Sequence, residues 1–203
     1  EDYLADMIRQ RKFDALLPRI DDGARILDIA AGAGELQMFL RKHHKEVEYI
    51  GLDYNDQRVA VARTADIDVR SFDCTDLDAL DSFIEENGPF DVITCIYALY
   101  FFPEPERFLA TIRGRANRLF LGVFNGGHIQ YRVRLLFGRS VCPGFHYYPV
   151  GEKQINFSEM SRFWTLKDYV FVLKELGYRS VKLISAKTEG SSIHHSPRRF
   201  LFP

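Results

Sequence analysis

The chain has 203 residues, 46% of them hydrophobic and 27% charged, and its formal net charge of −1 excludes a general electrostatic attraction to nucleic acid or to an anionic membrane. This length and balance are typical of one globular α/β domain, and the three cysteines (Cys74, Cys95 and Cys142) lack the spacing of a zinc site or a disulfide framework, so that we expect no metal and a reducing, cytoplasmic setting. No apolar run is long enough to cross a bilayer, and we expect neither a signal peptide nor a membrane span.

An amphipathic helix is predicted over residues 3–17, where Pro18 and the turn at 21–23 end the pattern. From residue 25 onward, short apolar runs alternate with stretches of helical periodicity. The run over residues 90–96 is almost continuously apolar, which is typical of a central strand in a parallel sheet. We expect strands over residues 25–30, 47–52, 67–72, 90–96, 118–124 and 178–186, and helices over residues 35–43, 57–64, 77–86, 105–114, 128–137 and 165–176.

This alternation predicts a Rossmann-like fold, in which helices cover a doubly wound, mostly parallel sheet of about seven strands. We expect a single domain over residues 1–203. After the fifth strand the alternation breaks, and residues 126–163 are predicted to form a helical and aromatic insertion. We can place no convincing seventh strand before the chain ends.

The most informative segment is the turn between the first strand and the next helix, where Gly32 and Gly34 let a nucleoside ligand lie against the backbone. A dinucleotide fingerprint requires Gly-x-Gly-x-x-Gly, and Gln37 stands at the third glycine position. Asp28 and Glu35 flank the turn. Two carboxylates there disfavour a pyrophosphate but suit a ligand that carries positive charge. A close helix–strand packing turn without a ligand is the alternative.

Open α/β sheets bind ligands at the carboxyl ends of their strands. Asp53 ends the second strand at the spacing expected for a carboxylate that accepts the ribose hydroxyls, with helix capping as its alternative role. Asp73 follows the third strand, where it can accept a hydrogen bond from an adenine amino group, although it also belongs to a solvated acidic run. Ile96 and Tyr97 leave the fourth strand, and their backbone is expected to pass under the ligand, with core packing as the favoured interpretation of the Ile96 side chain.

Together these strand ends resemble the class I S-adenosylmethionine-dependent methyltransferases, through residues 26–34, 51–53, 72–74 and 90–93. That family usually has glycine at the position of Ala30, and alanine is tolerated there if its φ angle is not positive. The resemblance implies S-adenosylmethionine as cofactor and S-adenosylhomocysteine as its product. The residues assigned to this cofactor site are Asp28, Ala30, Gly32, Gly34, Asp53, Tyr54, Asp73, Cys74 and Ile96.

A narrower set of segments is similar to the MetW-like family of methionine-biosynthesis proteins: residues 103–109, 124–128, 132–139, 156–157 and 163–169. Ile129 stands where that family has tryptophan, and residues 145–149 replace a Pro-Tyr-Gln-Trp-like segment. The last strand of that family would begin near Phe202. This resemblance implies the same fold and a partner role with homoserine O-acetyltransferase.

Methyl transfer from a sulfonium is an in-line displacement, for which a protein mainly supplies positioning and desolvation. A base is needed only when the acceptor is a hydroxyl or a protonated amine. His128 and Tyr131 are the candidate catalytic residues, and His128 has the alternative role of a helix N-cap or a satisfied polar residue. Tyr97, His146 and Tyr147 are further candidate bases. We therefore predict a cytoplasmic methyltransferase for O- or N-methylation of a small molecule, with a MetW-like partner protein as the alternative.

Overall fold

The computed structural model describes residues 13–138, 149–150, 153–154, 164–186 and 198–202. Most of the helix predicted over 3–17 therefore lies outside the described residues, and the described part of it is a turn followed by the 3-10 helix η1 (Leu17–Arg19). His146 and Tyr147, two of the candidate bases, also lie outside the described residues. The same holds for Cys142 and for residues 145–148 of the segment at 145–149.

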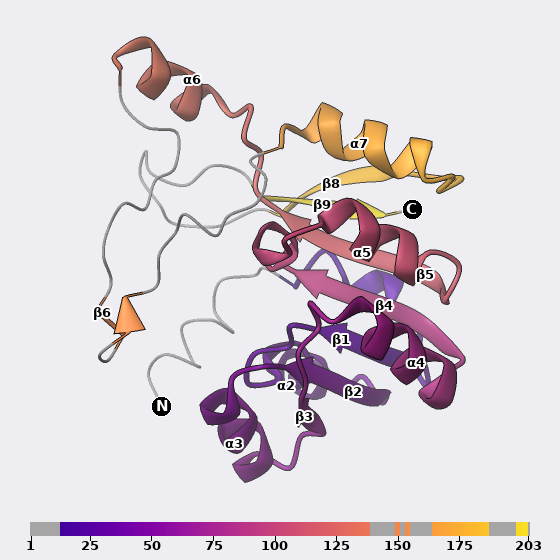
Figure 1. Ribbon diagram of the computed structural model, residues 1–203. Coiled ribbons are helices and arrows are strands. Elements are labelled where there is room, and N and C mark those ends of the chain that lie inside the picture. Colours follow the sequence, from indigo (N-terminus) through magenta and orange to yellow (C-terminus); the bar gives the residue numbers. More distant parts are fainter. Residues whose placement is uncertain (1–12, 139–148, 151–152, 155–163, 187–197, 203) are drawn as a thin grey trace.

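The described strands form one main sheet in the order β3-β2-β1-β4-β5-β9-β8 (Figure 1). The first five strands in this order run parallel, and β9 is antiparallel to both β5 and β8. The order reverses between β1 and β4, and this confirms the Rossmann-like, mostly parallel fold. The strand bounds are β1 (Arg25–Ile29), β2 (Glu48–Asp53), β3 (Val69–Ser71), β4 (Phe90–Ile96), β5 (Ala116–Val123), β8 (Lys182–Ala186) and β9 (Arg198–Phe202).

The last strand, β9, corrects the expectation that none can be placed before the chain ends. It lies within the chain, and Leu201 pairs with Leu121 of β5 on one side and with Leu183 of β8 on the other. Its sequence has only three consecutive apolar residues after two arginines, which is too short to show a strand periodicity. Pairing on both sides, and not local pattern, therefore accounts for this strand.

Two predicted strands are shorter in the structure because helix ends take up their first residues. The Ile67 N–H donates to the carbonyl oxygen of Ala62, so residue 67 is held against the end of the helix over residues 56–64 and does not join the strand. The Tyr178 N–H likewise donates to the Leu173 carbonyl oxygen, and the Tyr178 hydroxyl donates to the Leu109 carbonyl oxygen at 2.7 Å. Residue 178 therefore packs at the helix layer instead of joining the sheet.

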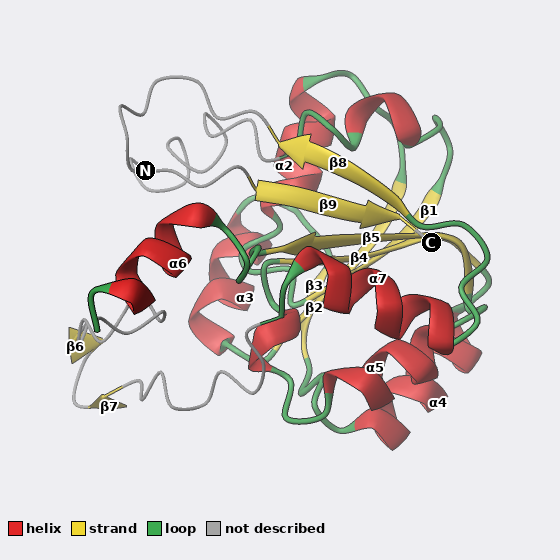
Figure 2. Cartoon of the chain, turned by 90° about the horizontal axis from the view of Figure 1, so that it is seen from above, coloured by secondary structure: helices red, strands yellow, loops and turns green. Residues whose placement is uncertain are grey.

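Helices of the described part cover both faces of the sheet: α2 (Glu35–Lys42), α3 (Asp56–Thr64), α4 (Leu77–Asn87), α5 (Pro105–Ile112) and α7 (Leu166–Glu175). On one face lie α4, α5 and α7 (Figure 2), and Leu80, Phe108 and Leu173 of these helices are buried in one apolar cluster. On the other face, Leu36 of α2 and Val59 of α3 are buried in a second cluster. The sheet is thus covered on both sides, as a parallel sheet requires.

Capping side chains fix where the helices begin. Thr165 forms a capping box with Asp168 at the start of α7, and Gly177, just after that helix, has a φ of +80°. The Asn55 side chain accepts from two backbone N–H groups of α3.

The segment after β5 leaves the sheet. It contains the helix α6 (Ile129–Leu136), which stands apart from the sheet in Figure 1, and two short paired strands, β6 (Pro149–Val150) and β7 (Lys153–Gln154). The rest of the predicted insertion lies outside the described residues. None of the helices in the described part has the length and apolar character that a membrane crossing requires.

Candidate functional site

The carboxyl ends of the five parallel strands lie along one edge of the sheet, and the reversal of strand order between β1 and β4 opens a ligand crevice there in folds of this type. Residues predicted as site residues follow four of these strand ends. The structure therefore places the glycine turn, Asp53 and Asp73 on the same edge, as the sequence predicts.

Asp53 connects the end of β2 to the glycine turn after β1. One carboxylate oxygen accepts the Gly32 N–H at 2.8 Å, and the other accepts the Asn55 N–H at 2.9 Å. An ionised carboxylate has about four acceptor positions, so two remain for further donors such as ribose hydroxyls. The sequence predicted the place of Asp53 but not its bond to the turn.

Asp28 lies inside β1 between its two neighbouring strands. Its carboxylate accepts hydrogen bonds from the Tyr49 hydroxyl of β2 at 2.7 Å and from the Thr94 hydroxyl of β4 at 2.5 Å. Burial and the negative charge of Asp28 raise the pKa of Tyr49 well above its usual value, so Tyr49 stays a hydrogen-bond donor. These two donors hold the Asp28 side chain within the sheet, beneath the turn.

The glycine turn uses positive φ angles at alternate positions: +57° at Ala30, +64° at Gly32 and +78° at Gly34. The value at Ala30 corrects the expectation that alanine occurs there without a positive φ. A left-handed conformation costs a residue with a Cβ about 1–2 kcal/mol relative to glycine. The turn tolerates this cost because the backbone is fixed on both sides, by β1 and by the bond from Gly32 to Asp53.

The predicted site residues after β2 and after β3 differ in how far their side chains are exposed to solvent. Tyr54 is 75% exposed, and Asp73 is exposed with one carboxylate oxygen accepting from the Thr75 N–H and hydroxyl. Cys74 is buried beside the Ala30 backbone, and this burial raises the pKa of its thiol to about 12. The Cys74 thiol is therefore protonated at neutral pH and behaves as a small apolar group.

An aromatic cluster lies at the ends of β4 and β5. The rings of Tyr97 and Phe124 are 5.1 Å apart, and those of Phe124 and Tyr100 are 5.3 Å apart. Tyr97 has a φ of +59°, and its N–H donates to the Gly122 carbonyl oxygen at 2.8 Å. A Cβ on Gly122 would lie 2.8 Å from the Ile96 side chain, so glycine is required for this close approach.

His128 lies in the loop between β5 and α6, and Tyr131 lies in the first turn of α6. His128 is partly buried directly before α6, and its backbone carbonyl accepts the Tyr131 N–H at 3.0 Å. The two rings are 6.3 Å apart and edge-on. The backbone of His128 thus takes a cap-like position at the start of α6, as one of the predicted alternatives has it.

Asn125 fixes this loop, and sequence reasoning did not select it. Its side-chain oxygen accepts from the Gly127 N–H at 3.0 Å and from the Leu166 N–H at 3.4 Å. The Gly126 N–H also donates to the Trp164 carbonyl oxygen at 2.9 Å. An asparagine directly after a buried strand, followed by two glycines, is the sequence signal that indicates such an anchor.

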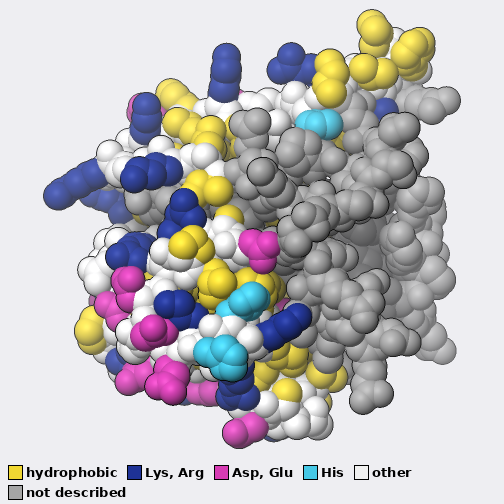
Figure 3. Space-filling view, turned by 180° about the vertical axis from the view of Figure 1, so that it is seen from behind, with side chains coloured by type: hydrophobic (Ala, Val, Ile, Leu, Met, Phe, Trp, Pro, Cys, Tyr) yellow, Lys and Arg dark blue, Asp and Glu magenta, His cyan; other side chains and the backbone are white. Residues whose placement is uncertain are grey.

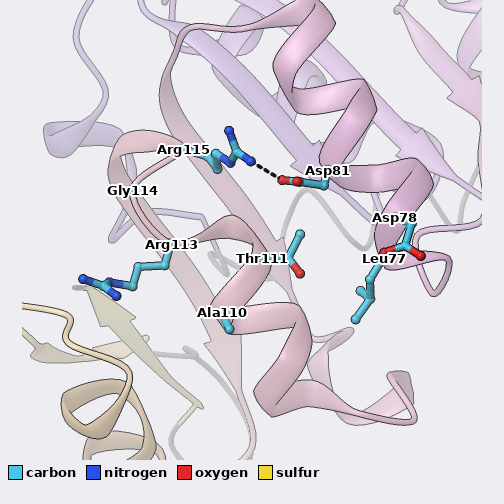
Figure 4. A pocket seen from close by; sticks show the side chains of 8 residues that line it. All are labelled: Leu77, Asp78, Asp81, Ala110, Thr111, Arg113, Gly114 and Arg115. Carbon is cyan, nitrogen blue, oxygen red and sulfur yellow. Dashed lines mark hydrogen bonds and ion pairs between the residues drawn. The ribbon is translucent and has the colours of Figure 1, made fainter.

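One surface hollow lies away from these residues. Figure 4 shows it between α4 and α5, with Arg115 reaching from the segment before β5 to Asp81 of α4. Arg115 also contacts Glu85 at 3.1 Å. These ion pairs tie α4 to the start of β5, and none of the predicted site residues lines the hollow. In the described part of the chain, no group of three His, Cys, Asp or Glu side chains is arranged to hold a metal ion.

Figure 3 shows the face of the molecule that is turned away from the viewer in Figure 1. Positive and negative side chains lie over the described elements of this face, and apolar side chains gather where α6 lies. Those exposed apolar side chains are Ile129, Val133, Leu135, Leu136 and Phe137.

Comparison with protein families finds that residues 27–118 match a model described as a methyltransferase domain. This stretch runs from β1 into β5 and contains the glycine turn, Asp53 and Asp73. A comparison with curated protein sequences finds no match. Over these residues, which make up less than half of the chain, the sequence is similar to a methyltransferase domain, and the match does not address the narrower MetW-like similarity.

Similar solved structures share the fold over almost the whole chain. One, a complex between the Haloferax volcanii Trm112 methyltransferase activator and a methyltransferase, has a TM-score of 0.66 at 14% identity and covers 97% of this chain and 89% of that chain. A SAM-dependent methyltransferase from Archaeoglobus fulgidus has a TM-score of 0.62 at 13% identity, with 95% and 91% covered. The plantazolicin methyltransferase BpumL in complex with SAH has a TM-score of 0.62 at 12% identity, with 98% and 83% covered. At these identities the likeness establishes the methyltransferase fold.

Proposed function

We propose that this chain is a class I S-adenosylmethionine-dependent methyltransferase that methylates an oxygen or nitrogen of a small molecule. The observation that carries the proposal is the Asp53 carboxylate at the end of β2, bonded to the Gly32 N–H of the turn after β1. This pair joins a ribose-binding carboxylate to a turn without bulky side chains, at the edge where such sheets bind nucleosides. Two similar structures were solved with SAH or described as SAM-dependent, which supports the same cofactor here.

The residues at this edge fit an adenosyl ligand without phosphate groups. Asp53 keeps acceptor capacity for ribose hydroxyls, and Tyr54 offers an exposed ring beside it. The carboxylates of Asp28 and Asp53, and the absence of a lysine or arginine between residues 26 and 40, disfavour a pyrophosphate. The proposed cofactor residues are Asp28, Ala30, Gly32, Gly34, Asp53, Tyr54, Asp73, Cys74 and Ile96.

The acceptor is proposed to lie against the aromatic cluster of Tyr97, Tyr100 and Phe124. These rings follow β4 and β5, next to the turn after β1, so they border the methyl-donating end of a bound cofactor. Aromatic faces bind apolar and planar groups well, and they offer no charge to a nucleic-acid backbone. This supports a small organic acceptor.

The cofactor supplies an activated methyl group on a sulfonium, which leaves as a neutral thioether once the methyl group has moved to the acceptor. The chain orients the two reactants and excludes water at the strand ends. For a hydroxyl or ammonium acceptor, the His128 imidazole takes the proton, with Tyr131 beside it. The Asn125 anchor keeps His128 at this edge.

Binding and turnover of the whole chain test this proposal. Calorimetry is expected to detect binding of both S-adenosylmethionine and S-adenosylhomocysteine, and incubation with a panel of phenols and amines is expected to give a methylated product by mass spectrometry. Absence of binding to either nucleoside would refute the cofactor assignment. Binding with methylation of RNA or protein, and of no small molecule, would refute the acceptor class.

The alternative function is that of a MetW-like partner protein of homoserine O-acetyltransferase. The observation in its favour is the apolar end of α6, where Leu135, Leu136 and Phe137 are exposed. A similar structure is described as a complex with a methyltransferase activator, so protein partners occur among proteins of this fold. Co-purification with purified homoserine O-acetyltransferase, lost in Leu136→Ser, would favour this alternative, and nucleoside binding without methyl transfer would accompany it.

A further inference from the structure

The helix α6 carries a stripe of exposed apolar side chains. It follows β5 and stands apart from the sheet (Figure 1). Four apolar residues occupy positions i, i+4, i+7 and i+8, the spacing that places side chains on one face of an α-helix: Ile129, Val133, Leu136 and Phe137. Their side chains are between 44% and 80% exposed, and Figure 3 shows apolar side chains gathered where α6 lies. We call these four residues the apolar stripe.

The backbone and the opposite side of α6 fix the direction of the apolar stripe. The Phe137 N–H donates to the Val133 carbonyl oxygen at 3.2 Å, so Phe137 continues the last turn of the helix. Gly138, with a φ of +65°, ends it. Tyr131 lies on the side of α6 opposite to the stripe and is buried. The stripe therefore faces away from the part of the chain that covers Tyr131.

Arginines accompany the apolar stripe. In a helical projection, Arg132 lies on one side of the stripe and Arg134 on the other. Arg132 is exposed and Arg134 is partly buried. Together with Arg139 they are the only charged residues between 119 and 151, a stretch without Asp or Glu. The whole chain has a formal net charge of −1, but the segment around α6 is positive.

An anionic lipid surface fits this combination better than a folded protein does. A standard protein interface has about 20–30 residues on each side, whereas the stripe offers four side chains of one exposed helix. A second copy of this chain would bring its own arginines against Arg132 and Arg134, and like charges repel. At a lipid surface, by contrast, apolar side chains enter the boundary of the acyl chains while guanidinium groups stay among anionic headgroups.

We propose that α6 docks this chain onto an anionic lipid surface, with the apolar stripe in the headgroup–acyl boundary and the flanking arginines among the lipid phosphates. Because α6 begins directly after His128, in the segment that follows β5, docking holds the carboxyl edge of the sheet close to the lipid. This inference goes beyond the proposed function and does not depend on methyl transfer.

Vesicle flotation of the whole chain tests the inference. We expect binding to vesicles of phosphatidylcholine with phosphatidylglycerol, about ten-fold weaker binding to phosphatidylcholine alone, and release at high salt, because the attraction is electrostatic. Replacing both Leu136 and Phe137 by serine is expected to weaken binding to the anionic vesicles by about ten-fold or more. Phe171→Ser, at an exposed phenylalanine of α7, is the matched control and should bind as the wild type does. Absence of binding to anionic vesicles, or equal binding by the wild type and the double variant, would overturn the inference.

Tryptophan fluorescence locates the contact. The chain has one tryptophan, Trp164, which lies outside α6. Phe137→Trp adds a second one on the stripe, and its emission is expected to shift to shorter wavelength with anionic vesicles, whereas the emission of the wild type should stay unchanged. A shift in the wild type, with no further shift in Phe137→Trp, would show that another surface binds the lipid and would overturn the inference.

Further measurements separate the lipid from other occupants of the stripe. Arg132→Gln, at an exposed position, is expected to keep the melting temperature of the wild type and to lose binding to anionic vesicles; unchanged binding would contradict the docking. Concentration-dependent association of the wild type that the double variant lacks would identify a second copy as the occupant. Capture of purified homoserine O-acetyltransferase without vesicle binding would identify a protein, and either result would overturn the inference. None of these measurements uses a cofactor or an acceptor, so a failure of the proposed function leaves their outcome unchanged.

Discussion

The Asp53 carboxylate accepts the Gly32 N–H at 2.8 Å, across 21 positions of the sequence. This bond joins the end of β2 to the turn after β1, which are neighbouring strands of the sheet. It fixes the orientation of the Asp53 carboxylate and of the turn backbone relative to a ligand bound at this edge. One carboxylate thus orders the turn and, in the proposed function, also binds the ribose.

Replacing Asp53 by asparagine separates these two roles. The asparagine amide keeps one oxygen that can accept from a backbone N–H, but the negative charge and the second accepting oxygen are lost. We expect the affinity for S-adenosylhomocysteine to fall about 10- to 100-fold, since a hydrogen bond to a charged group contributes about 1.5–3 kcal/mol. Calorimetry measures this change, with Asp78→Asn at an exposed position of α4 as the matched control. Unchanged affinity in Asp53→Asn would count against the ribose assignment.

Substitution by glycine is expected to be less destabilising at Ala30 than at the neighbouring Ala33. Ala30 has a φ of +57°, whereas Ala33, in the same turn, is not among the residues with positive φ. Glycine removes the left-handed strain at position 30, and this gain offsets the greater freedom of the unfolded chain. We expect Ala30→Gly to leave the free energy of unfolding unchanged or higher, and Ala33→Gly to lower it by about 0.5–1 kcal/mol. Urea titrations decide this, and a larger loss in Ala30→Gly would contradict the strain argument.

The sequence predicted the sheet well where local pattern and tertiary environment agree. The strand predicted over residues 90–96 is β4, Phe90–Ile96, because a continuous apolar run suits a strand covered on both faces. The prediction missed β9, since its few apolar residues gain their order by pairing with two distant strands. The local sequence pattern does not indicate pairing with strands that are distant in the sequence.

The candidate site shows the same division. The order of the strand ends follows from the alternation of strands and helices, so the positions of Asp53 and Asp73 were predictable. The partners of Asp28 were not, because Tyr49 and Thr94 reach it from 21 and 66 positions away. The positive φ of Ala30 was also missed, since alanine itself gives no sign of a left-handed backbone.

Gly122 is expected to be intolerant of alanine because the backbone of Tyr97 crosses it closely. A Cβ at this position would lie 2.8 Å from the Ile96 side chain and 3.1 Å from both the Ile96 Cα and the Tyr97 nitrogen. Such overpacking costs about 1–3 kcal/mol. We expect Gly122→Ala to lower the free energy of unfolding by this amount. Adding Ile96→Ala should recover only part of the loss, because two of the three contacts are with backbone; complete recovery would show that the side chain alone is responsible.

Alkaline pH is expected to destabilise the chain through Cys74. Its pKa is about 12 in the folded chain and 9.0 in the absence of burial, so unfolding releases the thiol proton between these values. Stability is therefore intact below pH 9 and falls as pH rises towards 12. At pH 10 this corresponds to about 1.4 kcal/mol. Urea titrations at pH 8 and pH 10 should show a smaller difference for Cys74→Ala than for the wild-type chain. Tyr49, whose pKa is also raised, adds to the fall in both proteins and so cancels in the comparison.

His128 is expected to affect turnover without affecting cofactor binding. In the proposed function its imidazole accepts the proton of a hydroxyl or ammonium acceptor, while the cofactor is held by residues of other strand ends. We expect His128→Gln to lower kcat/KM about 10²- to 10⁴-fold, the usual contribution of a general base, and to abolish the pH dependence that the base imposes. Calorimetry should give the same Kd for S-adenosylhomocysteine as in the wild-type chain. Asn125→Ala, which removes the anchor of the loop, should lower kcat/KM while keeping the pH dependence, because the imidazole remains but is less well held. A His128→Gln chain with full activity towards a hydroxyl acceptor would exclude His128 as the base, and Tyr131→Phe would then be the next variant to assay.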